Sequence, residues 1–148
     1  MTWTSLYPMM WQRSSTSEGV PAGHPYFSMG AVDTSKLSEK VLKIIKNRDN
    51  TLYLSSASVW EIVIKHSLDK LERTKKIKDL GEFIRECIAR MKVTPLPITI
   101  PHVLEISKLP HIHKDPFDRV LVAQARIHGL EILTKDPNIP RYGVETIW

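Results

Sequence analysis

The sequence predicts an α/β fold with a mainly parallel sheet that is covered by helices on both faces. From residue 36 onward, short apolar runs alternate with longer amphipathic runs, as expected when helices connect parallel strands. The length of 148 residues suits a single domain. No run approaches the roughly 18 consecutive apolar residues of a membrane helix, and no secretion signal opens the chain. We therefore expect a cytoplasmic protein with no membrane partner.

The composition changes near residue 35. Residues 1–35 hold three charged residues, whereas 34 of the next 113 residues are charged. The first segment shows no periodic apolar face, so we expect an atypical, irregular N-terminal segment at residues 1–35 and a folded domain at residues 36–148. Residues 26–32 could form a weak strand, which Gly30 interrupts.

The periodicity of apolar residues gives the order of the elements in the folded domain. Helices are expected at residues 37–47, 58–71, 80–91, 99–109 and 116–128, and strands at residues 51–54, 93–98, 132–134 and 144–147. Pro95 and Pro97 place their strand at an edge of the sheet, because proline cannot donate to a ladder. Gly129 ends the last helix.

Two helices carry specific expectations about burial. The helix at residues 58–71 is expected to bury Trp60, Ile64, Leu68 and Leu71, which recur on one face. Cys87, the single cysteine, falls among apolar residues at helical spacing. We therefore expect it to be a small core residue in a reducing compartment.

The positive charge is concentrated in one part of the chain. Lysine and arginine number 21 against 16 aspartates and glutamates, and residues 36–92 hold 14 basic and 8 acidic residues, a net charge of +6. Such a surface suits a polyanionic substrate, since binding to phosphates releases counterions. Lysine-rich helix faces that are merely solvated remain the alternative.

Four acids follow strands or begin helices where the carboxyl ends of parallel strands should meet. Glu61 lies one turn into the helix after strand 51–54, and Asp136 directly follows strand 132–134. Asp115 and Asp118 are three residues apart at the start of the last helix. Ligands of such sheets bind at this edge, and Mg²⁺ or Mn²⁺ prefers these oxygen ligands. The sequence therefore predicts a divalent metal site.

Each acid also has a purely structural explanation. Glu61 fits a capping box with the serine three residues before it, and it precedes Lys65 at ion-pair spacing. Asp115 suits an N-cap, Asp118 suits the helix dipole, and Asp136 suits a turn. Their joint placement favours the metal site, because the helix after Asp118 is apolar nearly all round and would leave that carboxylate buried and in need of a partner.

The histidines and the cysteine receive no role at this stage. His111 and His113 have no third ligand at a zinc-site spacing. Cys87 has no identifiable base.

Three stretches resemble the PIN-domain ribonucleases, most closely the VapC-type toxins of type II toxin-antitoxin systems. The stretches are LSSASVWEIVIK at residues 54–65, HKDPFDRVLVAQA at residues 113–125 and ILTKD at residues 132–136. The resemblance implies a PIN-like three-layer sandwich and an endoribonuclease dependent on Mg²⁺ or Mn²⁺ that cuts RNA with a metal-activated water. It also implies a homodimer and a cognate antitoxin protein whose tail blocks the site.

The resemblance also assigns residues by position. Glu61, Asp118 and Asp136 match the family's second, third and fourth acids, and these three are the catalytic candidates. Asp115 matches an accessory acid, so all four are candidate metal ligands.

One departure from the family concerns the N-terminus. The family begins with a central hydrophobic strand that ends in Asp-Thr-His and supplies the first acid, whereas residues 1–32 show neither feature. We therefore expect the first strand to be missing or replaced, as a frameshift or misassigned start would explain; the other reading frames upstream of Lys36 would test this. Asp33 precedes a stretch that matches a later loop, so it is a poor substitute for the first acid.

The departure leaves two functions open. Without a central strand, its neighbours would keep unpaired backbone groups, at about 1–3 kcal/mol each if buried. With one acid fewer, metal affinity and rate should both fall. The sequence thus predicts a metal-dependent endoribonuclease toxin impaired by the loss of its first acid, or alternatively a catalytically inactive PIN-like module that binds an antitoxin or RNA.

Overall fold

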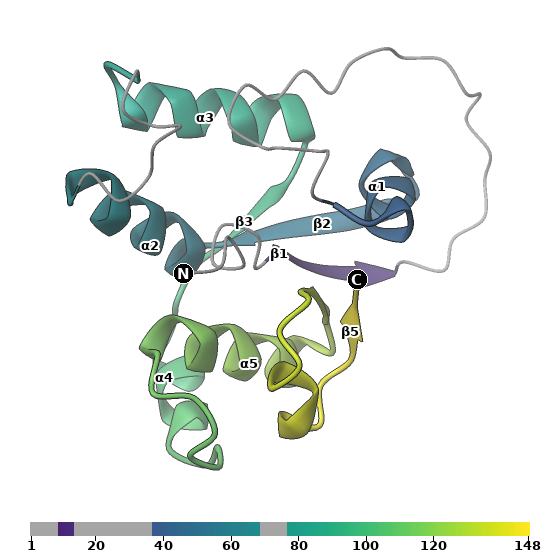
Figure 1. Ribbon diagram of the computed structural model, residues 1–148, viewed down its shortest axis with the longest axis vertical. Helices are drawn as coiled ribbons and strands as arrows, with labels where there is room; N and C mark the ends of the chain where they lie inside the picture. The colour runs from purple at the N-terminus through teal and green to yellow at the C-terminus, as the bar shows by residue number, and fades with distance from the viewer. Residues whose placement is uncertain (1–8, 14–36, 69–76) are drawn as a thin grey trace.

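A single five-stranded sheet forms the centre of the protein. The computed structural model describes residues 9–13, 37–68 and 77–148 (Figure 1). The strand order is β3-β2-β1-β4-β5. The strands are β1 (Met9–Arg13), β2 (Asn50–Ser55), β3 (Thr94–Leu96), β4 (Glu131–Leu133) and β5 (Thr146–Ile147).

Four of the five strands point in the same direction, and the central one is reversed. β2 pairs with β3 in parallel, as β4 does with β5, while β1 is antiparallel to both β2 and β4. Met9 lies opposite Leu54 and Leu133, and Arg13 lies opposite Asn50. The start of β1 is therefore at the edge where its neighbours end. The predicted mainly parallel sheet with a replaced central strand is confirmed.

The presence of β1 corrects one energetic expectation. Because Met9–Arg13 takes the central position, β2 and β4 both have a ladder partner, and the expected loss of their backbone hydrogen bonds does not occur. The weak strand expected at residues 26–32, and Asp33 after it, lie outside the described residues.

Five α-helices pack around the sheet. They are α1 (Glu39–Lys46), α2 (Ser56–Ser67), α3 (Leu80–Met91), α4 (Ile100–Ile106) and α5 (Pro116–His128), followed by a short 3-10 helix, η4 (Ile139–Tyr142). The five α-helices follow the predicted order, whereas η4 was not predicted. No helix among the described residues has the length and apolar character needed to cross a membrane.

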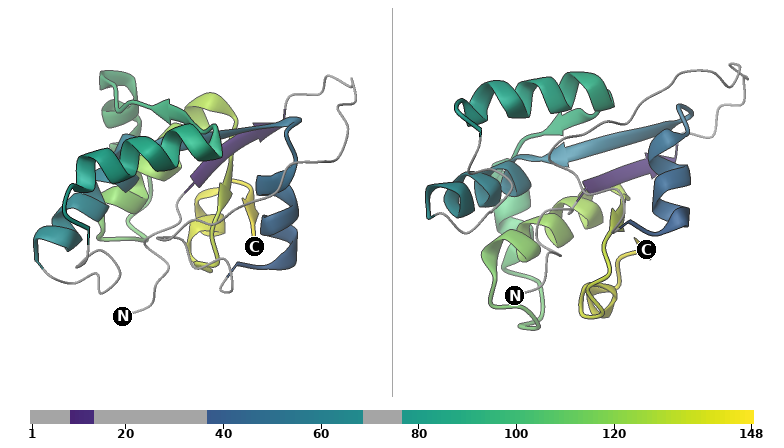
Figure 2. Two further views of the ribbon diagram at one scale, coloured as in Figure 1. Left: turned by 90° about the horizontal axis from the view of Figure 1, so that it is seen from above. Right: turned by 45° about the horizontal axis from the view of Figure 1, so that its top comes forward.

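Two hydrophobic clusters, one on each face of the sheet, make the fold a three-layer sandwich (Figure 2). In β4, Ile132 belongs to the cluster under α5, and Leu133 belongs to the cluster that includes Val41 of α1. This alternation follows from the two-residue period of a strand. On the α5 side, residues 120–125 are all buried, as predicted for this helix.

Contacts between α4 and α5 hold the two helices together on one face. His102 Nε2 lies 2.7 Å from His128 Nε2, and Arg126 Nε lies 3.3 Å from Glu105 Oε1. The chain between these helices, residues 107–115, is thereby fixed at both ends.

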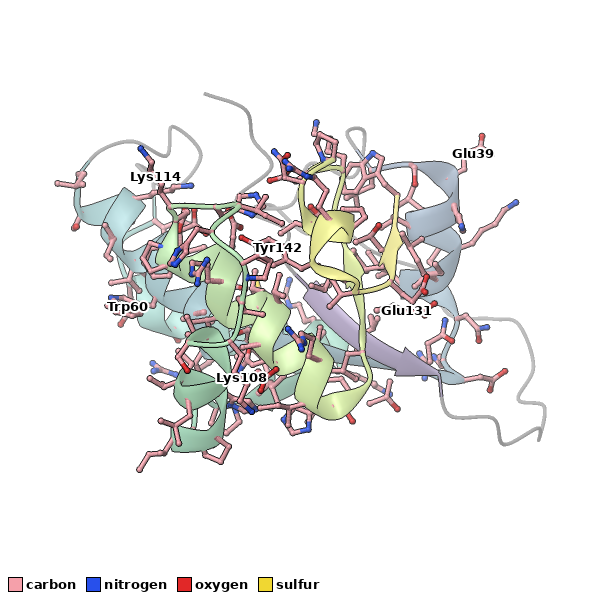
Figure 3. The ribbon with its side chains drawn as sticks, turned by 90° about the horizontal axis from the view of Figure 1, so that it is seen from below. Glu39, Trp60, Lys108, Lys114, Glu131 and Tyr142 are labelled. Atoms are coloured by element: carbon pink, nitrogen blue, oxygen red, sulfur yellow. The ribbon has the colours of Figure 1, made fainter. Side chains whose placement is uncertain are left out.

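The burial predicted for α2 is wrong. Trp60 and Leu68 are 54% and 55% exposed, and Ile64 is also exposed, so the apolar stripe faces outward (Figure 3). The inward face consists of small and polar residues, Ala57, Ser58 and Glu61. Hydrophobic periodicity identified the helix but not its orientation, because a period shows that residues share a face and does not show which face is buried. Leu71 lies outside the described residues.

The prediction that Cys87 belongs to the core is also wrong. Its exposure is intermediate, and no residue of α3 is fully buried. Of this helix, Ile88 and Met91 pack against the hydrophobic cluster that includes Val41. Partial burial still raises the pKa of the Cys87 thiol.

A buried polar bridge ties the ends of two strands to α5. Ser55 Oγ, at the end of β2, donates to Gln124 Oε1 at 2.6 Å, and Gln124 Nε2 donates to the carbonyl oxygen of Pro97 after β3 at 3.2 Å. Ser55 and Gln124 are both fully buried. Because an unpaired buried polar group is costly, this bridge fixes α5 relative to the edge where the strands end.

The ladder on both sides of β1 predicts a large effect of proline there. Met10→Pro removes an N–H from the middle of the central strand, which should lower the free energy of unfolding by a few kcal/mol. Met10→Ala keeps the backbone donor and is the matched control. Thermal melts of both variants measure the difference, and equal melting temperatures would contradict the position of β1.

Candidate active site

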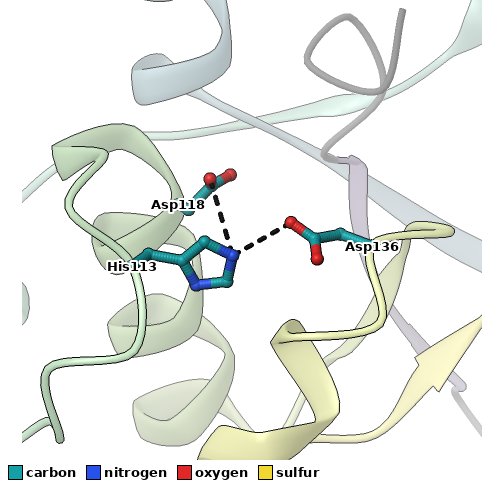
Figure 4. Close-up of side chains that lie close together, drawn as sticks. All are labelled: His113, Asp118 and Asp136. Carbon is teal, nitrogen blue, oxygen red and sulfur yellow. Dashed lines mark hydrogen bonds and ion pairs between the residues drawn. The ribbon is translucent and has the colours of Figure 1, made fainter. Parts of the chain in front are cut away.

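His113, Asp118 and Asp136 come together at the edge where β2 and β4 end (Figure 4). His113 comes from the loop before α5, Asp118 from the first turn of α5, and Asp136 from the loop after β4. One ligand atom of each residue lies within 4.8 Å of the others. This is the group that the described residues offer to a metal ion.

The imidazole of His113 lies between the two carboxylates. Its Nε2 is 2.9 Å from Asp136 Oδ2 and 4.0 Å from Asp118 Oδ2. The side chain of His113 is 11% exposed, and those of Asp118 and Asp136 are 28% and 25% exposed. The three groups are thus largely shielded and still reachable from solvent.

Asp136 is held by its own loop as well as by His113. Its Oδ1 accepts the backbone N–H of Asn138 at 2.8 Å, and its own N–H donates to Thr134 Oγ1 at 3.1 Å. Burial alone would raise the pKa of Asp136, but the hydrogen bonds from Asn138 and His113 outweigh it and lower the pKa. The predicted turn role is confirmed, and the other carboxylate oxygen remains directed at the cluster.

Asp118 carries the largest electrostatic strain of the site. Burial is the largest cause of its raised pKa, followed by the negative charge of Asp115; His113 lowers the pKa, and Glu61 and Asp136 raise it, so that the net value is about 6. Glu61 and Asp136 therefore both lie close enough to act on the same carboxylate. The four predicted acids are gathered at one side of the molecule.

Glu61 lies outside the group formed by His113, Asp118 and Asp136. Its surroundings show that the predicted capping box with Ser58 is wrong. The carboxylate is buried and pairs with Lys65 Nζ at 2.5 Å, as the four-residue spacing predicted. The capping box with Ser58 does not form, because α2 begins at Ser56 with Ser55 as its N-cap. The buried charge of Glu61 is therefore balanced by Lys65 and has no part in capping the helix.

Asp115 caps α5, as predicted, and lies outside the closest group. Its Oδ1 accepts the backbone N–H of Phe117 at 2.8 Å, and the residue is exposed. It contributes to the site through its charge on Asp118.

His113 is the residue that sequence reasoning missed. The absence of a third nitrogen or thiolate ligand at zinc spacing gave it no role, whereas its partners are the carboxylates of Asp118 and Asp136. Its position two residues before the Asp-Pro-Phe-Asp motif was the available signal, since this places it in the loop that leads to Asp118. Arg119 anchors the same loop, donating to the carbonyl oxygens of Pro110 at 2.9 Å and Ile106 at 3.1 Å.

β1 supplies no acid to the site. Its sequence is Met-Met-Trp-Gln-Arg, without aspartate or glutamate. Its reversed direction also takes Arg13 to the opposite edge of the sheet, beside Asn50 at the start of β2. A first acid placed at the end of this strand, as in the family, would therefore not reach Asp118.

Comparison with protein families identifies the chain. The PIN domain model matches residues 28–145, and the chain therefore belongs to the PIN domain family. This membership implies nuclease activity in general and suggests that RNA is bound. Comparison with curated proteins finds no match, and comparison with solved structures finds none either.

The residues of the site fit a divalent cation of the kind that PIN domains generally use. Asp118 and Asp136 offer hard oxygen ligands within reach of one another. Burial first, and neighbouring negative charge second, raise the pKa of Asp118, and a bound cation would stabilise its charged form.

The electrostatics of Asp118 predict a pH-dependent stability. Because its folded-state pKa lies above the ordinary value of 3.8, the folded chain retains a proton that the unfolded chain has already lost. The free energy of unfolding should therefore fall as pH rises from about 4 to 6, by up to about 3 kcal/mol.

Asp118→Asn removes this penalty. In metal-free buffer, we expect the variant to melt several degrees above the wild type at pH 7.5, with a smaller difference at pH 4.5. Thermal melts at the two pH values measure this. An equal difference at both values would show that Asp118 does not carry the strain.

Proposed function

We propose that the protein is a metal-dependent endoribonuclease of the VapC toxin type, with activity impaired by the loss of the family's first acid. The observation that carries the proposal is the convergence of Asp118 and Asp136, from separate elements, to within ligand distance in a PIN domain. The motif resemblance at residues 113–125 supports the toxin class.

Each acid has a role in this proposal. Asp118 and Asp136 hold Mg²⁺ or Mn²⁺, Glu61 adds negative charge from α2, and Asp115 acts as an accessory acid beside Asp118. When bound, the ion supplies an activated water for in-line attack on a phosphodiester. Arg119 and Asn138 hold the two loops that carry the site, which keeps the carboxylates in place before RNA arrives.

The impairment follows from the central strand. Because β1 provides no carboxylate at the edge where β2 and β4 end, the cation has one ligand and one negative charge fewer than in the family's pattern. Metal affinity and rate should both be lower, since charge count sets the affinity of such sites.

The net positive charge of residues 36–92 supports RNA as the substrate. Contacts between lysines and phosphates release counterions, so RNA binding should weaken steeply as salt increases. A homodimer and a cognate antitoxin remain part of the proposal on the strength of the motif resemblance alone; light scattering of the purified protein measures the first.

An inactive PIN-like module that binds an antitoxin or RNA is the second candidate. The reversed direction of β1 favours it, because an acid that follows this strand would lie at the opposite edge of the sheet, and β1 itself carries none. Such a module would keep the fold and the binding surface without turnover.

Cleavage assays separate the two candidates. We expect slow cleavage of RNA with Mn²⁺ that stops with EDTA and is lost in Asp118→Asn and Asp136→Asn. Glu86→Gln, at an exposed acid of α3, is the matched control and should cleave as the wild type does. Absence of cleavage at every metal concentration would overturn the enzyme proposal.

Thermal melts with Mn²⁺ test the metal centre independently of turnover. The ion should raise the melting temperature of the wild type and of Glu86→Gln, but not that of Asp118→Asn. Stabilisation without cleavage would favour the inactive module. An unchanged wild-type melting temperature would overturn the metal centre.

A further inference from the structure

We propose that His113 is a nitrogen ligand of the divalent ion at this site, and that it shifts the preference of the centre from Mg²⁺ toward transition-metal ions. The inference rests on the proposed metal centre and concerns its composition. The acids alone would make an all-oxygen site, whereas His113 Nε2 lies between Asp118 and Asp136 and is part of the same group.

The positions of the three atoms suit a shared ion. Ions of this size hold nitrogen and oxygen ligands at about 2.0–2.2 Å, so atoms bound to one ion lie about 3–4 Å apart. His113 Nε2 lies 2.9 Å from Asp136 Oδ2 and 4.0 Å from Asp118 Oδ2. Small side-chain rotations that move the donor atoms by less than about 1 Å, which is the scale of ordinary thermal motion, would bring all three atoms into one coordination sphere.

Tyr142 can support the tautomer that binds a metal. Its hydroxyl oxygen accepts the backbone N–H of His113 at 2.7 Å and lies 3.2 Å from Nδ1 of the same residue. A ligating imidazole needs a lone pair on Nε2 and its proton on Nδ1, with a partner for that N–H. The tyrosine oxygen has a second lone pair and provides this partner.

The same hydroxyl supports the metal-free arrangement. There, Nε2–H donates to Asp136 Oδ2, and the Tyr142 O–H can turn to donate to Nδ1. Ion binding then exchanges one tautomer for the other while His113 keeps the same partner at Nδ1, because a hydroxyl both donates and accepts.

His113 is held in place before any ion arrives. Its ring stacks on that of Tyr142 with centroids 5.5 Å apart and an interplanar angle of 12°, and Tyr142 itself is buried. Arg119 fixes the loop through the carbonyl oxygens of Pro110 and Ile106. Binding therefore costs little side-chain entropy, as in other preorganised sites.

A nitrogen ligand changes the metal preference in a definite direction. Mg²⁺ takes oxygen ligands almost exclusively, whereas imidazole suits borderline ions, and affinity for a mixed site rises from Mn²⁺ to Co²⁺. His113 should therefore contribute most with Co²⁺, less with Mn²⁺ and least with Mg²⁺.

Calorimetric titration of the full chain with each ion alone tests the inference. His113→Gln should lower the affinity for Co²⁺ by at least about tenfold, as expected for loss of a ligand, and the affinity for Mg²⁺ by less than about twofold. His111→Gln, the same change at an exposed histidine two residues away, is the matched control and should leave both affinities unchanged. Tyr142→Phe should reduce Co²⁺ affinity in the same direction.

A spectroscopic readout uses the wild-type chain and does not depend on the folding of a variant. Pulsed electron paramagnetic resonance of the Mn²⁺-loaded protein should show coupling to a directly bound ¹⁴N nucleus. Ions that bind without this coupling, and equally well to His113→Gln, would overturn the histidine ligand while leaving the metal centre intact. Failure of all three ions to bind the wild type would overturn both.

Discussion

The hydrogen-bond ladders on the two sides of β1 hold the candidate site together. In the described sheet, β2 and β3 form one parallel pair, β4 and β5 form another, and β1 joins them. Glu61 follows β2, and Asp136 follows β4. The acids from the two halves can face each other only because the central strand holds the halves in register.

Crowded charge is the second consequence of this arrangement. A half-buried Asp118 among other acids costs stability at neutral pH, and the position of His113 between the carboxylates offsets part of that cost. Perturbed carboxylates of this kind are common where a cation or substrate binds. The same carboxylate therefore weakens the metal-free protein and favours binding of a divalent ion.

The elements and the acids could be predicted from the sequence because each depends on local signals. Asp115 caps its helix and Gly129 ends it in the left-handed conformation, as their residue types predict. The outward face of α2 could not be predicted, since Trp60 and Ile64 have the periodicity of a core stripe. The role of His113 depends on Asp136 and Tyr142, 23 and 29 residues away in the chain, and no local pattern records such a contact.

A parallel central strand would provide both a hydrogen-bond ladder for its neighbours and a side chain after its end at the edge of the site. The reversed β1 provides only the ladder. Backbone amides and carbonyls alternate along a strand whichever way it runs, so a segment of either polarity can complete the ladder. The position of a side chain that follows a strand does depend on direction, because the strand ends at one edge of the sheet or at the opposite edge. A central strand of reversed direction can therefore complete the ladder, but whatever follows it leaves the sheet at the margin opposite Asp118 and Asp136.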